Sequence, residues 1–205
     1  MSKKTYFLFL CYILSVILFV GCSIDTSQIE ENSVHIEPSN LFQGDTERLK
    51  PHLGIIGGLV KVSISGSNKS IFTRYEIWEN GELKSSHASF STPVKNNFNG
   101  EVSVSLKDDI ENNDLFKVTI VISHANGYGA SEFTIPKFSR DLSFSPNELR
   151  KAIDIKEGEE VAVWSLLAQS KGRSFFCGDI EESAKKADWA FVLKVSVKDN
   201  QDNKE

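Results

Sequence analysis

Four histidines are the side chains of this sequence best suited to acid–base chemistry or metal binding near neutral pH. No two of them are separated by two or four residues, the spacings that place two ligands side by side on a strand or a helix. A β-sheet can still bring distant ligands together, but the spacing itself predicts no zinc site. The four are His35, His52, His87 and His124.

Cys177 is another candidate for chemistry, because a thiolate beside a histidine can act as a nucleophile. It stands alone between Phe176 and Gly178, and a lone cysteine of this kind more often packs as a small apolar side chain. A hydrolase whose site is assembled from loops is kept as an alternative, since the fold rather than the spacing places catalytic residues. It would use some of His87, His124, Cys177 and the acids near Asp108.

Two further patterns are compatible with chemistry but are better explained without it. Oxygen ligands for calcium cluster between residues 108 and 114, where a solvated acidic turn is the simpler interpretation. Ser183 and Lys186 have the Ser-x-x-Lys spacing of a nucleophile and its base, yet the Ser-Asp-Asn and Lys-Thr-Gly elements that accompany it are missing from the sequence. We therefore expect no metal and no cofactor.

Trp78 is the residue best suited to binding a partner. Residues 71–79 alternate as a strand does, which puts Phe72, Arg74, Glu76 and Trp78 on one side. Large rings occur on both sides, so one side should face a core and the other should display Trp78 beside charged neighbours. Such a surface stacks on sugars or packs against a protein, although a loop or the N-terminal segment lying over Trp78 would fit the same pattern.

The first 22 residues have the layout of a secretory leader. Two lysines at positions 3 and 4 precede a run of 17 residues, 5–21, that carries no charge, and Cys22 follows a small residue. A membrane-spanning helix needs about 20 predominantly apolar residues. The run is therefore short for a permanent anchor.

The tetrad Phe19-Val20-Gly21-Cys22 resembles the lipobox of bacterial prolipoproteins. That family prefers Leu three positions before the cysteine, where this chain has Phe19. The resemblance implies that residues 1–21 are a signal peptide and that the thiol of Cys22 receives a lipid with long acyl chains such as palmitate. It also implies that the rest of the chain lies on the extracytoplasmic face of the cell membrane. An uncleaved anchor would leave the body on the same side.

Composition divides the rest of the 205-residue chain into three parts. Residues 22–52 are polar and acidic without sustained periodicity, so we expect a flexible tether with a helical turn near 45–50. Residues 53–198 are expected to form one folded domain, which is long enough to bury a core. Residues 199–205 carry only charged or amide side chains, so we expect a disordered tail.

Period-two alternation dominates residues 53–198. Asn-Gly pairs at 80–81 and 126–127 predict hairpins. Two short helices are expected: at 145–153, which opens with a capping serine and a proline, and at 179–187. The predicted strands are 59–65, 71–79, 83–90, 100–106, 115–122, 130–135, 161–168 and 189–198. Together these elements predict an all-β fold, an antiparallel β-sandwich that is immunoglobulin-like or related.

The net charge of −5 argues against binding to nucleic acid, which requires a concentrated basic surface. Since the sequence contains no recognisable catalytic constellation, we expect a non-catalytic binding module, held at the cell envelope through Cys22. The expected partner is an envelope protein or a polysaccharide. Two alternatives stay open: the loop-assembled hydrolase, and a structural or stress-related component of the envelope.

Overall fold

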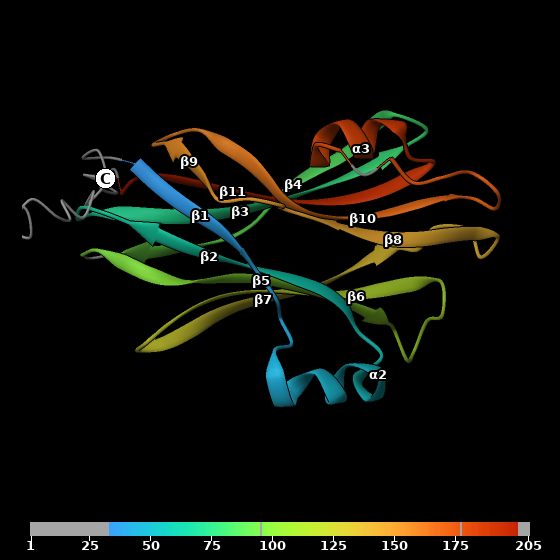
Figure 1. The fold of residues 1–205 in the computed structure, drawn as a ribbon, viewed down its shortest axis with the longest axis horizontal. Helices are drawn as coiled ribbons and strands as arrows, with labels where there is room; N and C mark the ends of the chain where they lie inside the picture. Colours follow the sequence, from blue (N-terminus) through green and yellow to red (C-terminus); the bar gives the residue numbers. More distant parts are fainter. Residues whose placement is uncertain (1–32, 95, 177, 201–205) are drawn as a thin grey trace, which may run out of the picture.

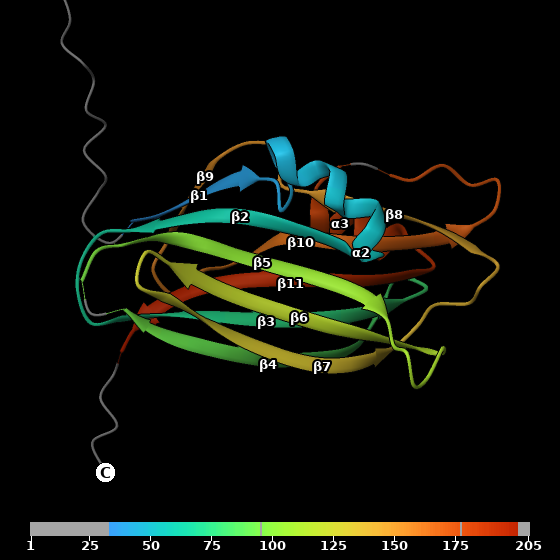
Figure 2. The same ribbon diagram turned by 90° about the horizontal axis from the view of Figure 1, so that it is seen from below.

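Two antiparallel β-sheets packed face to face form the body of the protein (Figures 1 and 2). The computed structural model describes residues 33–94, 96–176 and 178–200. In spatial order, sheet A consists of β7 (Gly127–Pro136), β6 (Leu115–His124), β5 (Phe98–Asp108), β2 (Ile56–Ile64), β1 (Ser33–Ser39) and β9 (Ile153–Lys156). Sheet B consists of β4 (Glu82–Val94), β3 (Lys69–Glu79), β11 (Trp189–Asp199), β10 (Glu160–Ser170) and β8 (Leu142–Glu148). This architecture confirms the predicted antiparallel sandwich.

The core lies between the two sheets, where alternate side chains of each strand interdigitate. Trp164 and Phe191 of sheet B pack there against the valines and isoleucines of sheet A, and Trp189 is buried as well. Gly58 of β2 lies directly under the indole of Trp164, so that a side chain at residue 58 would overlap the ring. This close approach of strand and ring requires glycine at that position.

All eight predicted strands are confirmed; they correspond to β2 to β7, β10 and β11. The first Asn-Gly pair forms the predicted tight turn between β3 and β4, with Asn80 and Gly81 both at positive φ. The second predicted hairpin joins β6 and β7. Because His124 pairs with Gly127 there, the turn residues are Ala125 and Asn126, one position earlier than the Asn-Gly pair.

The expected tether over residues 22–52 is wrong for its second half. Residues 33–39 form β1, an inner strand of sheet A between β2 and β9, and Val34 and Ile36 are fully buried. The alternation of these two apolar residues with His35 and Glu37 is the signal of the strand, but it is short and acidic residues surround it. The helical turn expected near 45–50 is confirmed as the 3-10 helix η1 (Gly44–Leu49), followed by α2 (Lys50–Leu53).

The expected helix at 145–153 is also wrong, because this segment forms the second half of β8 (Leu142–Glu148), the connection 149–152 and the first residue of β9 (Ile153–Lys156). Strand β8 pairs with β10 at the border of sheet B, with Pro146 opposite Leu166. A border strand tolerates proline when its missing N–H faces away from the paired neighbour. Backbone pairing along β10 therefore prevails over the local helix signal of Ser145 and Pro146.

The second expected helix is confirmed as α3 (Ile180–Lys186), which covers the outer face of sheet B. The Asp179 side chain caps it by accepting hydrogen bonds from the backbone N–H groups of Glu181 and Glu182. Ile180 and Ala184 pack with residues of β10 and β11 in a second, smaller apolar cluster. Figure 1 shows α3 above the strands of this sheet.

Both ends of the described chain lie at the same end of the sandwich (Figure 2). Ser33 starts β1 opposite Lys156 of β9, and Asp199, one residue beyond the predicted strand, ends β11 opposite Lys69 of β3. We call this the terminal end. The opposite end, which we call the loop end, carries the connection between β5 and β6, the start of β2 and the connection between β7 and β8.

Among the residues that the structure describes, no helix combines the length and the apolar character needed to cross a bilayer. Residues 1–32, which include the expected leader and the lipidation site Cys22, lie outside the described residues, as do 201–205 of the expected tail.

Candidate functional site

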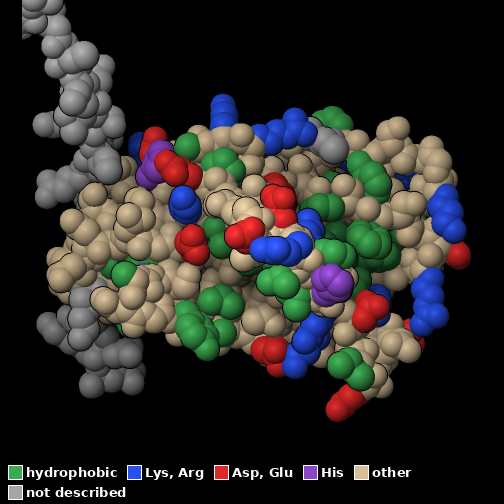
Figure 3. Space-filling view, turned by 60° about the horizontal axis from the view of Figure 1, so that its bottom comes forward, with side chains coloured by type: hydrophobic (Ala, Val, Ile, Leu, Met, Phe, Trp, Pro, Cys, Tyr) green, Lys and Arg blue, Asp and Glu red, His purple; other side chains and the backbone are tan. Residues whose placement is uncertain are grey.

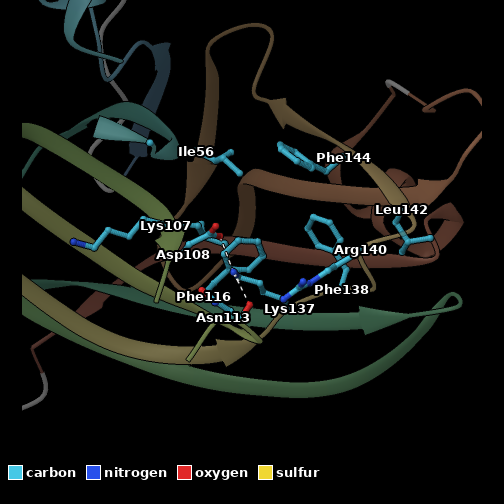
Figure 4. A pocket seen from close by; sticks show the side chains of 12 residues that line it. Ile56, Lys107, Asp108, Asn113, Phe116, Lys137, Phe138, Arg140, Leu142 and Phe144 are labelled. Atoms are coloured by element: carbon cyan, nitrogen blue, oxygen red, sulfur yellow. Dashed lines mark hydrogen bonds and ion pairs between the residues drawn. The ribbon is translucent and has the colours of Figure 1, made fainter. Parts of the chain in front are cut away.

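An open groove of about 610 Å³ lies between the two sheets at the loop end (Figure 4). This volume is within the range of roughly 300–1,000 Å³ that is typical of small-molecule sites. Five segments line it: Gly54 and Ile56; Leu106, Lys107 and Asp108; Asn113 and Phe116; Lys137, Phe138 and Arg140; Leu142 and Phe144. We call it the loop-end groove.

The groove exists because the chain crosses there from sheet A to sheet B. Residues 137–141 join the end of β7 to the start of β8 and run along the opening between the sheets. Two backbone hydrogen bonds fix this crossing: Lys137 N–H donates to Asp114 O over 2.9 Å, and Leu142 N–H donates to Ser139 O over 3.0 Å. The crossing thereby holds Phe138 in the groove.

Aromatic rings form the apolar wall of the groove. The Phe138 ring lies 5.6 Å from Phe116, 5.6 Å from Phe144 and 5.3 Å from Trp189, measured between centroids. Phe116 and Trp189 are buried, whereas the side chain of Phe144 is 50% exposed. Figure 4 shows Phe138 between the other two phenylalanines. The wall therefore extends from the core to a rim where an apolar group of a ligand could be covered.

Lys137 is a structural cation of the groove. Its Nζ lies 2.7 Å from Asp108 Oδ1, donates a hydrogen bond to the backbone O of Asn113 over 2.8 Å, and lies 5.1 Å from the centroid of the Phe116 ring. The side chain is only 16% exposed. These contacts use the ammonium donors and tie the loop before β6 to the crossing segment.

Arg140 is the available cation of the groove. Its side chain is 81% exposed, and among the described residues its ion pair joins Nη2 to Asp114 Oδ1 over 3.7 Å, with Asp114 itself 88% exposed. An exposed pair at this distance contributes little to stability. Lys107 also lines the groove, but its side chain extends away from the rings (Figure 4). The groove thus joins an aromatic wall to one guanidinium that a bound anion can engage.

Trp78 lies elsewhere, on the outer face of sheet B, and is half-buried. Its Nε1–H donates to Glu76 Oε2 over 2.9 Å, it packs against the apolar cluster under α3, and the Lys185 ammonium lies 5.8 Å from its ring centroid. The predicted arrangement of the strand is confirmed in that Ile77 faces the core while Trp78 faces outward. The ring is partly covered by α3, and its indole N–H already has a partner.

A charged network lies beside Trp78 and explains why Glu76 is buried. Lys194 Nζ lies 3.0 Å from Glu76 Oε1 and 2.8 Å from Glu181 Oε1. Burial lowers the pKa of Lys194, but the hydrogen bonds to Glu181 and Glu76 more than offset it, so the pKa is raised above 10.5. This network fastens α3 to sheet B, and we assign it a structural role.

The structure does not bring together the residues considered for a hydrolase. His124 lies at the end of β6 next to Phe98, at the terminal end, whereas Asp108 lies at the loop end. These ends of β6 are about 30 Å apart, given a rise of about 3.3 Å per residue. His87 is on the border strand β4, where it packs against Tyr75. Cys177 lies outside the described residues.

The other patterns singled out in the sequence have structural partners. Within the described residues no three His, Cys, Asp or Glu side chains are grouped as a metal site would require. In the acidic loop, Asp108 pairs with Lys137, and Asp109 Oδ1 accepts the N–H of Glu111. The buried Ser183 Oγ donates to the backbone O of Asp179 and accepts from Asn147, so it serves the start of α3.

Apart from the acidic loop that begins at Asp108, sequence reasoning did not identify the groove residues. Their signal is the segment 137–144, in which Phe138, Phe144 and Arg140 alternate with polar residues just after a predicted strand. That segment falls between the predicted strand 130–135 and the expected helix 145–153, so it was assigned to neither. The position of Phe116 beside Phe138 depends on how the two sheets pack. Comparison of the chain with protein families, with curated proteins and with solved structures found no match in any of the three.

Proposed function

We propose that this protein is a lipoprotein anchored through Cys22 on the extracytoplasmic face of the cell membrane, where it acts as a non-catalytic binding module. The loop-end groove is its binding site. The observation that carries this proposal is the position of the groove, which lies at the end of the sandwich opposite to Ser33 and Asp199. An anchor on the N-terminal side therefore leaves the groove accessible.

The anchor is supported by the leader and by physical estimates. Each buried methylene of an acyl chain contributes about 0.8 kcal/mol, and stable attachment takes two membrane signals, such as the two long chains of one lipidated cysteine. Residues 23–32 separate Cys22 from β1, and the chain from Cys22 to Ser33 reaches at most roughly 35–40 Å. The body is then held near the membrane with its terminal end toward it.

The partner we propose is an envelope protein or a polysaccharide. Acidic and basic side chains are interspersed on the face shown in Figure 3, and the net charge of the chain is −5, which does not favour binding to nucleic acid. The groove offers rings and one guanidinium, which suit a ligand with an apolar part and a negative charge. Among the described residues, its lining includes no histidine, cysteine or serine that would act as a nucleophile or base.

The anchor is tested by metabolic labelling with a palmitate analogue. Wild-type protein should incorporate the label and partition into detergent, and mass spectrometry should place the modification on Cys22 as the first residue of the mature chain. Cys22→Ala should lose the label and retain the leader. A labelled Cys22→Ala variant, or an unmodified Cys22 in the mature wild-type chain, would refute lipidation at this residue.

The binding site is tested by photo-crosslinking in intact cells. A photoreactive phenylalanine replaces Phe144 in the groove or, as a matched control, Leu83 on the border strand β4 of the same sheet. The two side chains are 50% and 48% exposed. We expect a discrete envelope component to be captured at position 144 and not at 83. The same adducts at both positions, or none at 144, would contradict the proposed site.

A further inference from the structure

We propose that the ligand of the loop-end groove is a short extended peptide segment of a protein partner, with a large apolar side chain next to a carboxylate. The apolar side chain packs on Phe138 and Phe144, and the carboxylate pairs with Arg140. This inference rests on the proposed function and adds the chemistry of the ligand.

The apolar part of the ligand follows from the ring arrangement. Phe138 contacts two buried rings, Phe116 and Trp189, which fix its position from the core side. Phe144 projects on the other side of Phe138 and is half exposed. A side chain such as Phe or Leu placed against these two rings gains aromatic packing and covers apolar area that now faces water. The exposed wall consists of two rings, which matches one large side chain better than a long alkyl chain.

The negative charge of the ligand follows from the difference between Arg140 and Lys137. The ammonium group of Lys137 is already paired with Asp108 and hydrogen-bonded to a backbone oxygen, so it does not require a charge from a ligand. Within the described residues, the ion pair of Arg140 is the 3.7 Å contact with the exposed Asp114. A guanidinium binds a carboxylate with two parallel hydrogen bonds, which are shorter and stronger than that contact. A ligand carboxylate at the rim therefore complements Arg140.

The peptide character of the ligand follows from β8. This strand is the last of sheet B, so within the described part of the chain only β10 pairs with it. An extended peptide can add to such a free border. The stretch available is short, because the Leu142 N–H already donates to Ser139 O and Pro146 has no N–H to offer. Two or three ligand residues beside Phe144 fit this length.

The test measures peptide binding to the mature full-length protein in nanodiscs by isothermal titration, with empty nanodiscs as the blank. The probe is the tripeptide acetyl-Gly-Ala-Phe with a free carboxylate, compared with the same peptide as a C-terminal amide. The groove variants are Arg140→Gln and Phe144→Ala. The matched controls are Arg48→Gln, whose side chain is 74% exposed on η1, and Leu83→Ala. Thermal unfolding confirms that each variant is folded.

We expect the acid to bind wild-type protein at least about tenfold more tightly than the amide, the factor that corresponds to one charge-assisted hydrogen bond. Arg140→Gln should weaken the acid about tenfold and leave the amide unchanged. Phe144→Ala should weaken both peptides by a similar factor, and the two control variants should bind like wild-type protein. This pattern assigns the carboxylate to Arg140 and the apolar side chain to the rings.

Several results would overturn the inference. These are no binding of the acid at millimolar concentration, equal binding of acid and amide, and an equal loss of both peptides in Arg140→Gln. Tighter, Phe144-dependent binding of decanoate or of an N-acetylglucosamine tetramer would assign the groove to lipid or to polysaccharide instead. The proposed function survives these failures if position 144 still captures an envelope component, and it fails separately if that crosslink is missing.

Discussion

His35 is held between two carboxylates on the outer face of sheet A. Its Nδ1 lies 2.6 Å from Asp154 Oδ1 on β9, and its Nε2 lies 3.1 Å from Glu37 Oε1. The hydrogen bond to Asp154 raises the pKa of His35 above 6.5; burial lowers it, and the bond to Glu37 raises it further. Because the folded pKa exceeds the unfolded one, this stabilisation is complete below about pH 6.5 and is lost as the pH rises through the folded pKa.

We expect the free energy of unfolding to fall by up to about 1 kcal/mol from this source between about pH 6 and pH 8, the amount typical of a partly exposed pair. Urea denaturation at several pH values measures this change in the free energy of unfolding. His35→Gln should remove the pH dependence. The control, His52→Gln at the exposed His52 on α2, should leave it in place. By NMR, Asp154→Asn should lower the pKa of His35. An unchanged pKa in Asp154→Asn would show that the pairing is absent in solution.

At the residue scale, burial was easier to predict from the sequence than the site. Trp164 and Trp189 lie on the predicted strands 161–168 and 189–198 and are buried in the core, because strand alternation assigns each residue to one side. Trp78 was correctly placed on the outer side, but its coverage by α3 depends on tertiary packing. Phe138 was not singled out, since its neighbours Phe116 and Trp189 come from other strands and from both sheets.

At the scale of elements, α3 is short enough to depend on its cap and its packing. Helices of one or two turns are unstable by themselves, so the two hydrogen bonds accepted by Asp179 matter. We expect Asp179→Ala to lower the free energy of unfolding by about 1 kcal/mol, the usual cost of losing an N-cap, measured by urea denaturation. Asp141→Ala, at an exposed aspartate between β7 and β8, is the control. If the two variants are equally stable, the cap contributes nothing measurable.

The elements that could be predicted are those whose signals are local. The hairpin of β3 and β4 follows from alternation around Asn80 and Gly81, and both residues adopt the positive φ that this turn requires. β1 and β8 could not be predicted in the same way. β1 is stable because β2 and β9 pair on both of its sides, and β8 because β10 offers it an unpaired border. Such long-range pairing leaves little trace in a segment of seven residues.

At the scale of the whole molecule, the proposed anchor orients the sandwich. We expect a dye at Ser67, in the turn between β2 and β3 at the terminal end, to transfer energy to membrane dyes more efficiently than a dye at Ile110, which is 93% exposed at the loop end. A strand of 11 residues separates the two ends by about 35 Å. The measurement uses Ser67→Cys and Ile110→Cys in a Cys177→Ser background, on lipidated protein in vesicles. Equal transfer from both positions would mean that the body lies flat on the membrane.

Because both ends of the described chain lie at the terminal end, the order of the strands along the polypeptide can be permuted. Lys156, the neighbour of Ser33 across β1 and β9, precedes Glu157, whose hydrogen bond raises the pKa of Asp199 at the close of β11. A short linker from Asn200 back to Ser33 would thus span little space. Circular permutants opened at Ile110 should keep all strand pairings, and cargo fused after Asn200 should sit clear of the Phe144 rim.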